Sequence, residues 1–376
     1  MSTGQLRYVF LGLSITSSWD NEHATTYRAL LRQLSARGHE VIFLERDRPL
    51  HADHRDLASP PYATTSLYGC FEELVDRHRA TVRDADLVVV GSGVQEGARI
   101  GAWVQETAPG RAAFYDVDTP VTLAGIADGN TEHLTAALIP RYALYLSFTG
   151  GPTLLTLRDR YGAANVRPLY CSADPGQHFP VWAEERADLG YLGSYGQDRQ
   201  PAVERLFLGP ARHWSEGRFQ LAGTRYPGSI AWPSNVERAS HLDPSEDRGF
   251  YSSQRYTLNV TRPAMVEAGW SPSVRLFEAA ACGTPIISDP WPGLAEVFEP
   301  GIEILVARSS YDVLRYMREI SEDQRRALAT AARRRFLREH TAMHRAETLE
   351  RYTRELLEHP WRRSRRIAPA QTRLSS

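Results

Sequence analysis

Residues 270–289 constrain the fold of this chain more than any other stretch. They read Trp-Ser-Pro-Ser-Val-Arg-Leu-Phe-Glu-Ala-Ala-Ala-Cys-Gly-Thr-Pro-Ile-Ile-Ser-Asp. The stretch opens as a polar turn, becomes a short helix of small residues, breaks at Cys282-Gly283 and ends in an apolar strand. Because a run of alanines lets a helix lie close to a sheet, this order predicts a helix packed on a buried strand.

The start of the predicted helix carries polar residues in a specific pattern. Ser271 and Ser273 are N-cap residue types, and Arg275 and Glu278 lie three apart on one helical face. A helix N-terminus presents free backbone N–H groups to an anion, most plausibly a phosphate. Glu278 could accept hydrogen bonds from a pair of ribose hydroxyls. The alternative interpretation is an ordinary core helix with a glycine C-cap.

Strand patterns alternate with helical patterns along the whole chain. The predicted strands are 8–13, 41–45, 87–90, 112–115, 144–147 and 167–170, then 189–192, 218–222, 236–238, 256–260, 285–288 and 304–306. Such alternation predicts parallel sheets in an α/β fold. The chain has 376 residues, more than one core usually holds, and a turn-rich break at 172–180 separates two similar halves. We therefore predict two Rossmann-like domains, and closing helices at 311–317 and 322–356.

Residues 277–289, followed by 293–301 and 303–306, resemble the donor-site segment of GT-B-fold glycosyltransferases. Within that group the chain is most similar to the CgeB-like, family-4-type branch. The resemblance implies an N-terminal acceptor domain (1–173) and a C-terminal nucleotide-sugar donor domain (186–345) that face each other across a cleft. It also implies a helix (346–360) that crosses back to the first domain, before a basic tail (361–376).

The resemblance implies a hexosyl- or N-acetylhexosaminyltransferase that uses a nucleoside diphosphate donor of the UDP type. His23 follows the first strand and begins the first helix. Residues 23–41 resemble the opening helix of family-1-type enzymes, where a histidine deprotonates the acceptor. Imidazole suits this role because its pKa lies near neutrality. Asp118 is the candidate that orients this base, with Asp116 as a substitute.

Two alternatives remain open for the Asp116-Val-Asp118 sequence. It spells the Asp-x-Asp metal signature of the other major glycosyltransferase fold, and Asp118 could simply cap the following helix. The expected protein needs no metal and no cofactor, because its nucleotide sugar is a substrate.

The predicted nucleotide site extends beyond the helix start. Gly193, Ser194 and Arg199 follow the first strand of the second domain, and the resemblance places Arg199 on the diphosphate. His241 and Leu242 resemble the loop that frames the nucleotide base. A diphosphate that gathers charge without a metal needs charge-assisted contacts. The candidates are, in order, Arg199, Arg262 and Arg275.

Residues Ala268, Gly269 and Trp270 are expected to line the donor sugar. The family-4-type pattern has a glutamate eight residues before Glu278, but Trp270 stands there. A His23 base favours inversion at the anomeric carbon, whereas family-4-type kinship favours retention. A nucleotide-sugar 2-epimerase-like enzyme and a non-catalytic nucleotide-sugar-binding protein are the alternative functions.

Composition excludes several classes of partner. The formal net charge is −1, which predicts no nucleic-acid partner, and no apolar stretch is long enough to cross a membrane. All 44 basic residues are arginine, and the three cysteines are widely spaced, as expected for reduced thiols in a cytoplasmic protein. The basic tail is expected to be a solvated end, with contact to an anionic surface as the alternative. The acceptor is not predicted.

Overall fold

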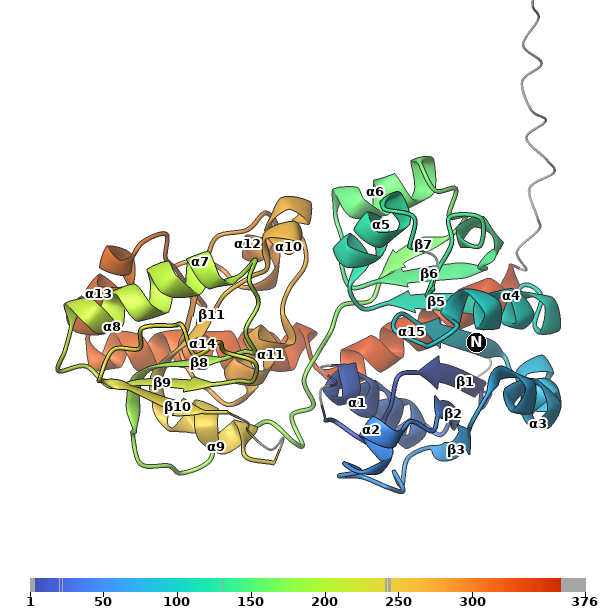
Figure 1. Cartoon of the computed structure of the whole chain (residues 1–376), viewed down its shortest axis with the longest axis horizontal. Helices are drawn as coiled ribbons and strands as arrows, with labels where there is room; N and C mark the ends of the chain where they lie inside the picture. Colours follow the sequence, from blue (N-terminus) through green and yellow to red (C-terminus); the bar gives the residue numbers. More distant parts are fainter. Residues whose placement is uncertain are drawn as a thin grey trace, which may run out of the picture.

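Each half of the chain forms a parallel sheet covered by helices. The computed structural model describes residues 4–19, 21, 23–130, 132–240, 242 and 245–359. The two halves lie side by side, with the first half in blue and green and the second mainly in yellow and orange (Figure 1). The predicted fold class, two α/β domains with parallel sheets, is confirmed.

The N-terminal sheet has seven strands in the order β3-β2-β1-β4-β5-β6-β7, all parallel. Its strands are β1 (Arg7–Gly12), β2 (Glu40–Arg46), β3 (Thr64–Tyr68), β4 (Leu87–Gly91), β5 (Ala112–Asp116), β6 (Leu144–Ser147) and β7 (Val166–Pro168). Its helices are α1 (His23–Ala36), α2 (Pro49–Ala52), α3 (Phe71–Arg83), α4 (Gly97–Thr107), α5 (Thr119–Ala127) and α6 (Pro152–Asp159), with a 3-10 turn at Ile139–Arg141. The central strands are buried on both faces, which explains their continuous apolar runs.

The C-terminal sheet has six parallel strands in the order β10-β9-β8-β11-β12-β13. Its strands are β8 (Ala187–Leu192), β9 (Phe219–Ala222), β10 (Val236–Ala239), β11 (Gln254–Asn259), β12 (Ile286–Ser288) and β13 (Leu305–Val306). Its helices are α7 (Gln200–Val203), a π turn (Glu204–Leu208), α8 (Gly209–His213), α9 (Asp247–Ser252), α10 (Pro263–Ala268), α11 (Val274–Ala281), α12 (Leu294–Val297), α13 (Ser310–Glu319) and α14 (Glu322–Glu339). The last helix, α15 (Ala342–Glu358), leaves this domain.

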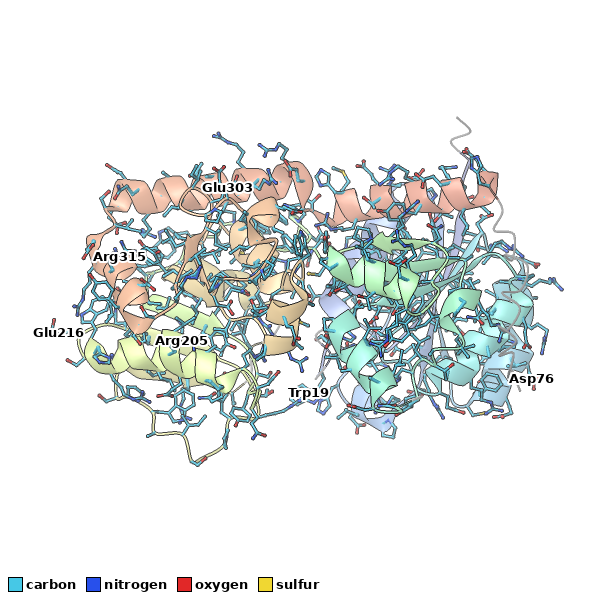
Figure 2. The ribbon with its side chains drawn as sticks, turned by 90° about the horizontal axis from the view of Figure 1, so that it is seen from above. Trp19, Asp76, Arg205, Glu216, Glu303 and Arg315 are labelled. Atoms are coloured by element: carbon cyan, nitrogen blue, oxygen red, sulfur yellow. The ribbon has the colours of Figure 1, made fainter. Side chains whose placement is uncertain are left out.

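The long helical pattern predicted at 322–356 is two helices in the structure. Helix α14 packs on α11, whereas α15 packs on α1 of the N-terminal domain. Figure 2 shows these two red helices one after the other along the same edge of the molecule. The break lies where Thr341 pairs with Ala173, so α15 starts four residues before the predicted position 346. The sequence holds no proline or glycine at this position that would end a helix. We attribute the break to this contact between distant segments.

Two strands also differ from the prediction. The edge strand β3 was not predicted, since its sequence Thr-Thr-Ser-Leu-Tyr is half polar and mostly only partly buried. Strand β7 ends at Pro168 instead of continuing to residue 170. Its partner β6 ends at Ser147, whose carbonyl oxygen accepts the last backbone hydrogen bond of this pair, from the Leu169 N–H at 2.8 Å.

Candidate functional site

A cavity of about 680 Å³ lies between the two domains. Its lining residues follow the ends of strands from both sheets: Leu13 follows β1, Asp118 follows β5, Ser194 follows β8, Arg225 follows β9 and Arg262 follows β11. Ligands of doubly wound sheets bind at this carboxyl edge. The volume also falls within the ~300–1,000 Å³ typical of small-molecule sites. The cavity is therefore the candidate functional site.

His23 lines the cavity from the N-terminal domain as the first residue of α1. Its backbone N–H donates to Oδ1 of Asn21 at 3.2 Å, and the N–H of Ala24 donates to the Asn21 carbonyl oxygen at 3.2 Å. Asn21 thus satisfies backbone donors at the helix start. The imidazole is held at the start of α1, the place that the sequence predicts for a base.

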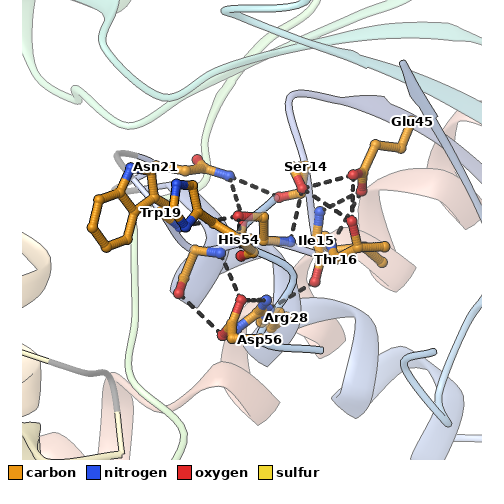
Figure 3. Close-up of polar contacts among 11 residues, drawn as sticks. Ser14, Ile15, Thr16, Trp19, Asn21, Arg28, Glu45, His54 and Asp56 are labelled. Carbon is orange, nitrogen blue, oxygen red and sulfur yellow. Dashed lines mark hydrogen bonds and ion pairs between the residues drawn. The ribbon is translucent and has the colours of Figure 1, made fainter. Parts of the chain in front are cut away.

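The loop before α1 is anchored by the buried carboxylate of Glu45 (Figure 3). Glu45 lies on β2 and accepts hydrogen bonds from the Ser14 hydroxyl (2.7 Å), the Thr16 hydroxyl (2.5 Å) and the backbone N–H groups of Ile15 (2.8 Å) and Thr16 (3.2 Å). A carboxylate is acceptor-only and has room for several donors, which suits this arrangement. The loop is therefore fixed to the sheet beneath the cavity.

A second set of contacts fixes the outer part of the same loop. Arg28 of α1 makes a two-pronged ion pair with Asp56, at 2.6 and 2.9 Å, and Ser18 donates to the same carboxylate. The indole of Trp19 stacks on the imidazole of His54, with ring centroids 4.2 Å apart and planes 17° from parallel. Trp19 lines the cavity.

The two aspartates after β5 have different surroundings. Asp116 is fully buried and accepts hydrogen bonds from the hydroxyls of Tyr145 (2.6 Å) and Thr122 (2.7 Å). Burial raises its pKa. It does not line the cavity, so it cannot substitute for Asp118 there, and the Asp-x-Asp pair does not present two carboxylates to a metal in the cavity.

Asp118 does line the cavity. It occupies the N-cap position of α5, but its side chain makes no capping hydrogen bond, so the capping alternative is wrong. Its Oδ2 lies 3.2 Å from Nη1 of Arg262 in the C-terminal domain. Arg262 also reaches Asp198, with 3.3 Å between Nε and Oδ2. An ion pair therefore joins the two domains across the cavity.

The C-terminal side of the cavity contains Gly193, Ser194 and Arg199 at the end of β8. The Arg199 side chain is buried, and its Nη2 donates to the Ser194 carbonyl oxygen at 2.7 Å. Its Nε–H has no hydrogen-bond partner among the described residues. A buried guanidinium N–H without an acceptor destabilises the folded state. An anion in the cavity would satisfy it.

Helix α11 contributes Arg275 and Glu278 to the cavity. Ser273 is the N-cap, and its hydroxyl accepts the Arg275 backbone N–H at 3.3 Å. The hydroxyl of Ser271 lies 3.0 Å from that of Thr149 in the N-terminal domain. Neither serine is among the lining residues: Ser273 caps the helix and Ser271 joins the domains. Their contact with a nucleotide stays a prediction.

Glu278 is buried, and its Oε2 accepts a hydrogen bond from the Tyr251 hydroxyl at 3.0 Å. Burial, together with this carboxylate, raises the pKa of Tyr251 well above its usual value, so the phenol remains a donor. Each carboxylate oxygen has two lone pairs, so Glu278 can still accept hydrogen bonds from a ligand. Ligand atoms of His178, Asp247 and Glu278 lie within 4.8 Å of one another, and this group is where a metal ion could be held.

Ala268, Gly269 and Trp270 are not among the residues that line the cavity. Their contact with a donor sugar stays a prediction. The backbone of Trp270 has φ +43°, and it hydrogen-bonds Pro292 and Gly150 through its N–H and carbonyl oxygen. A Cβ on Gly151 would lie 2.5 Å from its indole, and one on Gly293 2.6 Å. Trp270 thus packs between Gly151 of the N-terminal domain and Gly293 of the C-terminal domain. A residue larger than glycine at either position would clash with its indole.

The prediction missed lining residues as well. Arg225 follows β9 with φ +67°, and Asp247 begins α9. Arg225 follows the carboxyl end of a predicted strand, and Asp247 lies at a helix start, so both positions could have been recognised in the sequence as candidates for the site. Leu242 lines the cavity, whereas His241 lies outside the described residues. The basic tail also lies outside them.

A family model described as "Glycosyl transferase-like" matches residues 199–351, about two fifths of the chain. This segment begins at Arg199 and contains α11. Residues 199–351 therefore resemble glycosyltransferases. No curated protein sequence matches the chain.

Solved structures resemble the whole chain in fold. Sucrose-phosphate synthase from Thermosynechococcus elongatus is 14% identical, with a TM-score of 0.68 over 94% of this chain and 100% of that one. HepE of Anabaena in complex with UDP-glucose is 13% identical, with a TM-score of 0.65 over 93% and 100%. An alpha-glucosyltransferase in complex with UDP-glucose and DNA containing an abasic site is 11% identical, with a TM-score of 0.69 over 93% and 100%.

The predicted resemblance to GT-B glycosyltransferases is confirmed: the fold is shared over nearly the whole chain, and the family match covers most of the C-terminal domain. The CgeB-like subtype stays a prediction. Among the described residues, no helix is long and apolar enough to cross a bilayer.

Proposed function

We propose that the protein transfers a sugar from a nucleoside diphosphate donor, of the UDP type, to an acceptor hydroxyl. The observation that carries this proposal is the composition of the interdomain cavity. Its C-terminal side holds Arg199, Arg275 and Glu278, and its N-terminal side holds His23. The UDP-glucose complexes of two structural neighbours support the choice of donor. The transferred group would be a hexosyl or N-acetylhexosaminyl unit.

The arginines would hold the diphosphate without a metal. Arg199 offers a buried N–H that has no partner in the part of the chain that the structure describes, and Arg262 and Arg275 line the same cavity. Charge-assisted contacts to guanidinium groups stabilise the negative charge that develops on a departing diphosphate. Glu278 would accept hydrogen bonds from the ribose hydroxyls, as its remaining lone pairs permit.

His23 would accept the proton of the acceptor hydroxyl. In the transfer, the bond between the anomeric carbon and the diphosphate oxygen breaks, and a bond to the acceptor oxygen forms. UDP leaves with the electron pair, and the acceptor proton passes to the imidazole. A general base of this kind contributes about 10²–10⁴-fold to the rate, so His23→Ala should lower kcat by that factor. Retention of the anomeric configuration, read by NMR of the product, would contradict an inverting role for His23.

The donor site is tested by thermal shift with nucleotides and nucleotide sugars. A ligand at ~100 times its dissociation constant should stabilise the wild-type protein by ~2.7 kcal/mol. Glu278→Gln and Arg199→Ala should lose most of this stabilisation. Glu216→Gln is the matched control, because Glu216 is exposed and lies outside the cavity.

The same experiment with EDTA, and with added manganese or magnesium, tests the absence of a metal. Stabilisation that disappears in EDTA would assign His178, Asp247 and Glu278 to a cation instead. If no nucleotide or nucleotide sugar stabilises the protein under any of these conditions, the donor site does not exist. Donor binding without transfer, or with epimerisation, would favour the two alternative functions.

A further inference from the structure

We propose that the acceptor is an uncharged saccharide that places one ring face against Trp19. This inference rests on the proposed function, because it concerns the acceptor side of the same cavity. The inference rests on the placement of a stacked Trp19–His54 pair on an anchored loop at the N-terminal side of the cavity. The arginines among the described lining residues belong to the opposite, C-terminal side.

Trp19 is partly exposed to the cavity. Its exposed fraction is 38%, although it stacks on His54 and lines the cavity. Figure 2 shows it at the junction of the two domains, and Figure 3 shows its indole at the end of the polar network far from Glu45. Aromatic rings exposed in a cavity are strong contact surfaces, because they bury a large area with few rotatable bonds.

The loop that carries Trp19 is held in place before any ligand binds. Glu45 anchors its inner part through four hydrogen bonds, and Arg28 and Asp56 anchor its outer part. A rigid contact surface costs little conformational entropy on binding. The Trp19–His54 stack is therefore a preformed platform.

The surroundings of this platform are polar. The other lining residues of the N-terminal domain are Ser18, Asn21, His23, Thr25 and Asp118, with Leu13 as the one aliphatic side chain among those described. A pocket for a flat apolar molecule would be lined mostly by apolar side chains. A sugar instead presents C–H groups on one face and hydroxyls at its edge. One aromatic face with a polar rim matches that chemistry.

The distribution of charge argues against an anionic acceptor. The four arginines among the described lining residues, Arg199, Arg225, Arg262 and Arg275, all belong to the C-terminal domain. The sequence from 13 to 25 contains two acids and no arginine. A phosphate or carboxylate taken from water needs a charged partner. Among the described lining residues, the N-terminal domain contributes no arginine, and the arginine that reaches it, Arg262, is already paired with Asp118. The acceptor saccharide should therefore carry no phosphate.

The test uses the donor identified by thermal shift and three acceptor sets. These are neutral disaccharides (maltose, cellobiose and lactose), hexose 6-phosphates, and planar phenols. Neutral disaccharides should be glycosylated, and Trp19→Ala should raise their KM about tenfold while the donor KM stays unchanged. Trp19→Phe should retain most of the affinity. Trp182→Ala is the matched control, because Trp182 is 94% exposed and lies outside the cavity.

Binding provides a second readout that does not depend on turnover. Saturation transfer by NMR from the protein to the disaccharide C–H protons should be strong in wild type and weak in Trp19→Ala. Preference for hexose phosphates or phenols, no transfer to any saccharide despite donor binding, or an unchanged KM in Trp19→Ala would each overturn the inference. Failure of all donors to bind would instead remove the proposed function itself.

Discussion

The buried carboxylate of Glu45 offers a direct test of how the fold positions the site. It lies on β2 and has no exposed surface, yet it holds the loop that leads to Trp19 and His23. Glu45→Leu would replace it by an apolar group of similar size. The backbone N–H groups of Ile15 and Thr16 would then lose their acceptor.

The magnitude follows from the contacts that remain. The Ser14 and Thr16 hydroxyls lie 3.5 Å apart and can turn toward each other, so the main loss is two buried amides. At about 1–3 kcal/mol for each unsatisfied amide, Glu45→Leu should cost about 4 kcal/mol of local stability. Glu45→Gln keeps an oxygen for the amides and an NH₂ group for the rotatable hydroxyls, so it should cost only about 1 kcal/mol.

Hydrogen exchange of a peptide that covers residues 13–24 measures this local stability. Exchange should be about a thousandfold faster in Glu45→Leu and about fivefold faster in Glu45→Gln. Glu40→Gln is the control on the same strand, since its ion pair with Arg7 is solvent-exposed and contributes little. Wild-type protection in Glu45→Leu, or equal damage from both Glu45 variants, would refute the reasoning.

Three further predictions follow from single contacts. Gly151→Ala should destabilise the protein by about 1–3 kcal/mol, because φ is +54° and the new Cβ would lie 2.5 Å from the Trp270 indole. The same clash should open the domain interface. Thermal unfolding would measure the loss of stability, and solution scattering the opening of the interface. Tyr251→Phe should weaken UDP binding about fivefold in titration calorimetry, since Glu278 loses its hydrogen bond, and an unchanged dissociation constant would contradict that role. Burial raises the pKa of Asp289 from 3.8 to about 6, so the folded state holds this proton more tightly than the unfolded chain. The free energy of unfolding should therefore fall by up to about 3 kcal/mol as the pH rises from 3.8 to about 6. Denaturation of Asp289→Asn should lack this component of the pH dependence; a wild-type profile in the variant would exclude Asp289 as its source.

Much of the secondary structure could be predicted from the sequence, because it depends on neighbours within a few residues. The apolar runs of β1 and β4 predict buried strands, and Ser273 before α11 is a local N-cap. Ligands of parallel sheets bind at the carboxyl ends of the strands, so residues that follow a strand are candidates for the site. His23 and Arg199 follow strands in this way, and both line the cavity. The α/β fold class and the resemblance of the C-terminal half to glycosyltransferases could thus be predicted from local patterns in the sequence.

The tertiary structure alone decided which side chains meet across the molecule. Asp118 pairs with Arg262, 144 residues away, and no spacing in the sequence predicts that ion pair. Trp270 occupies the position expected for a sugar-binding glutamate, but it packs between glycines of the two domains. The break between α14 and α15 likewise comes from the contact of Thr341 with Ala173. Local propensity sets strands and caps, whereas contacts between distant residues exist only once both sheets are folded and docked.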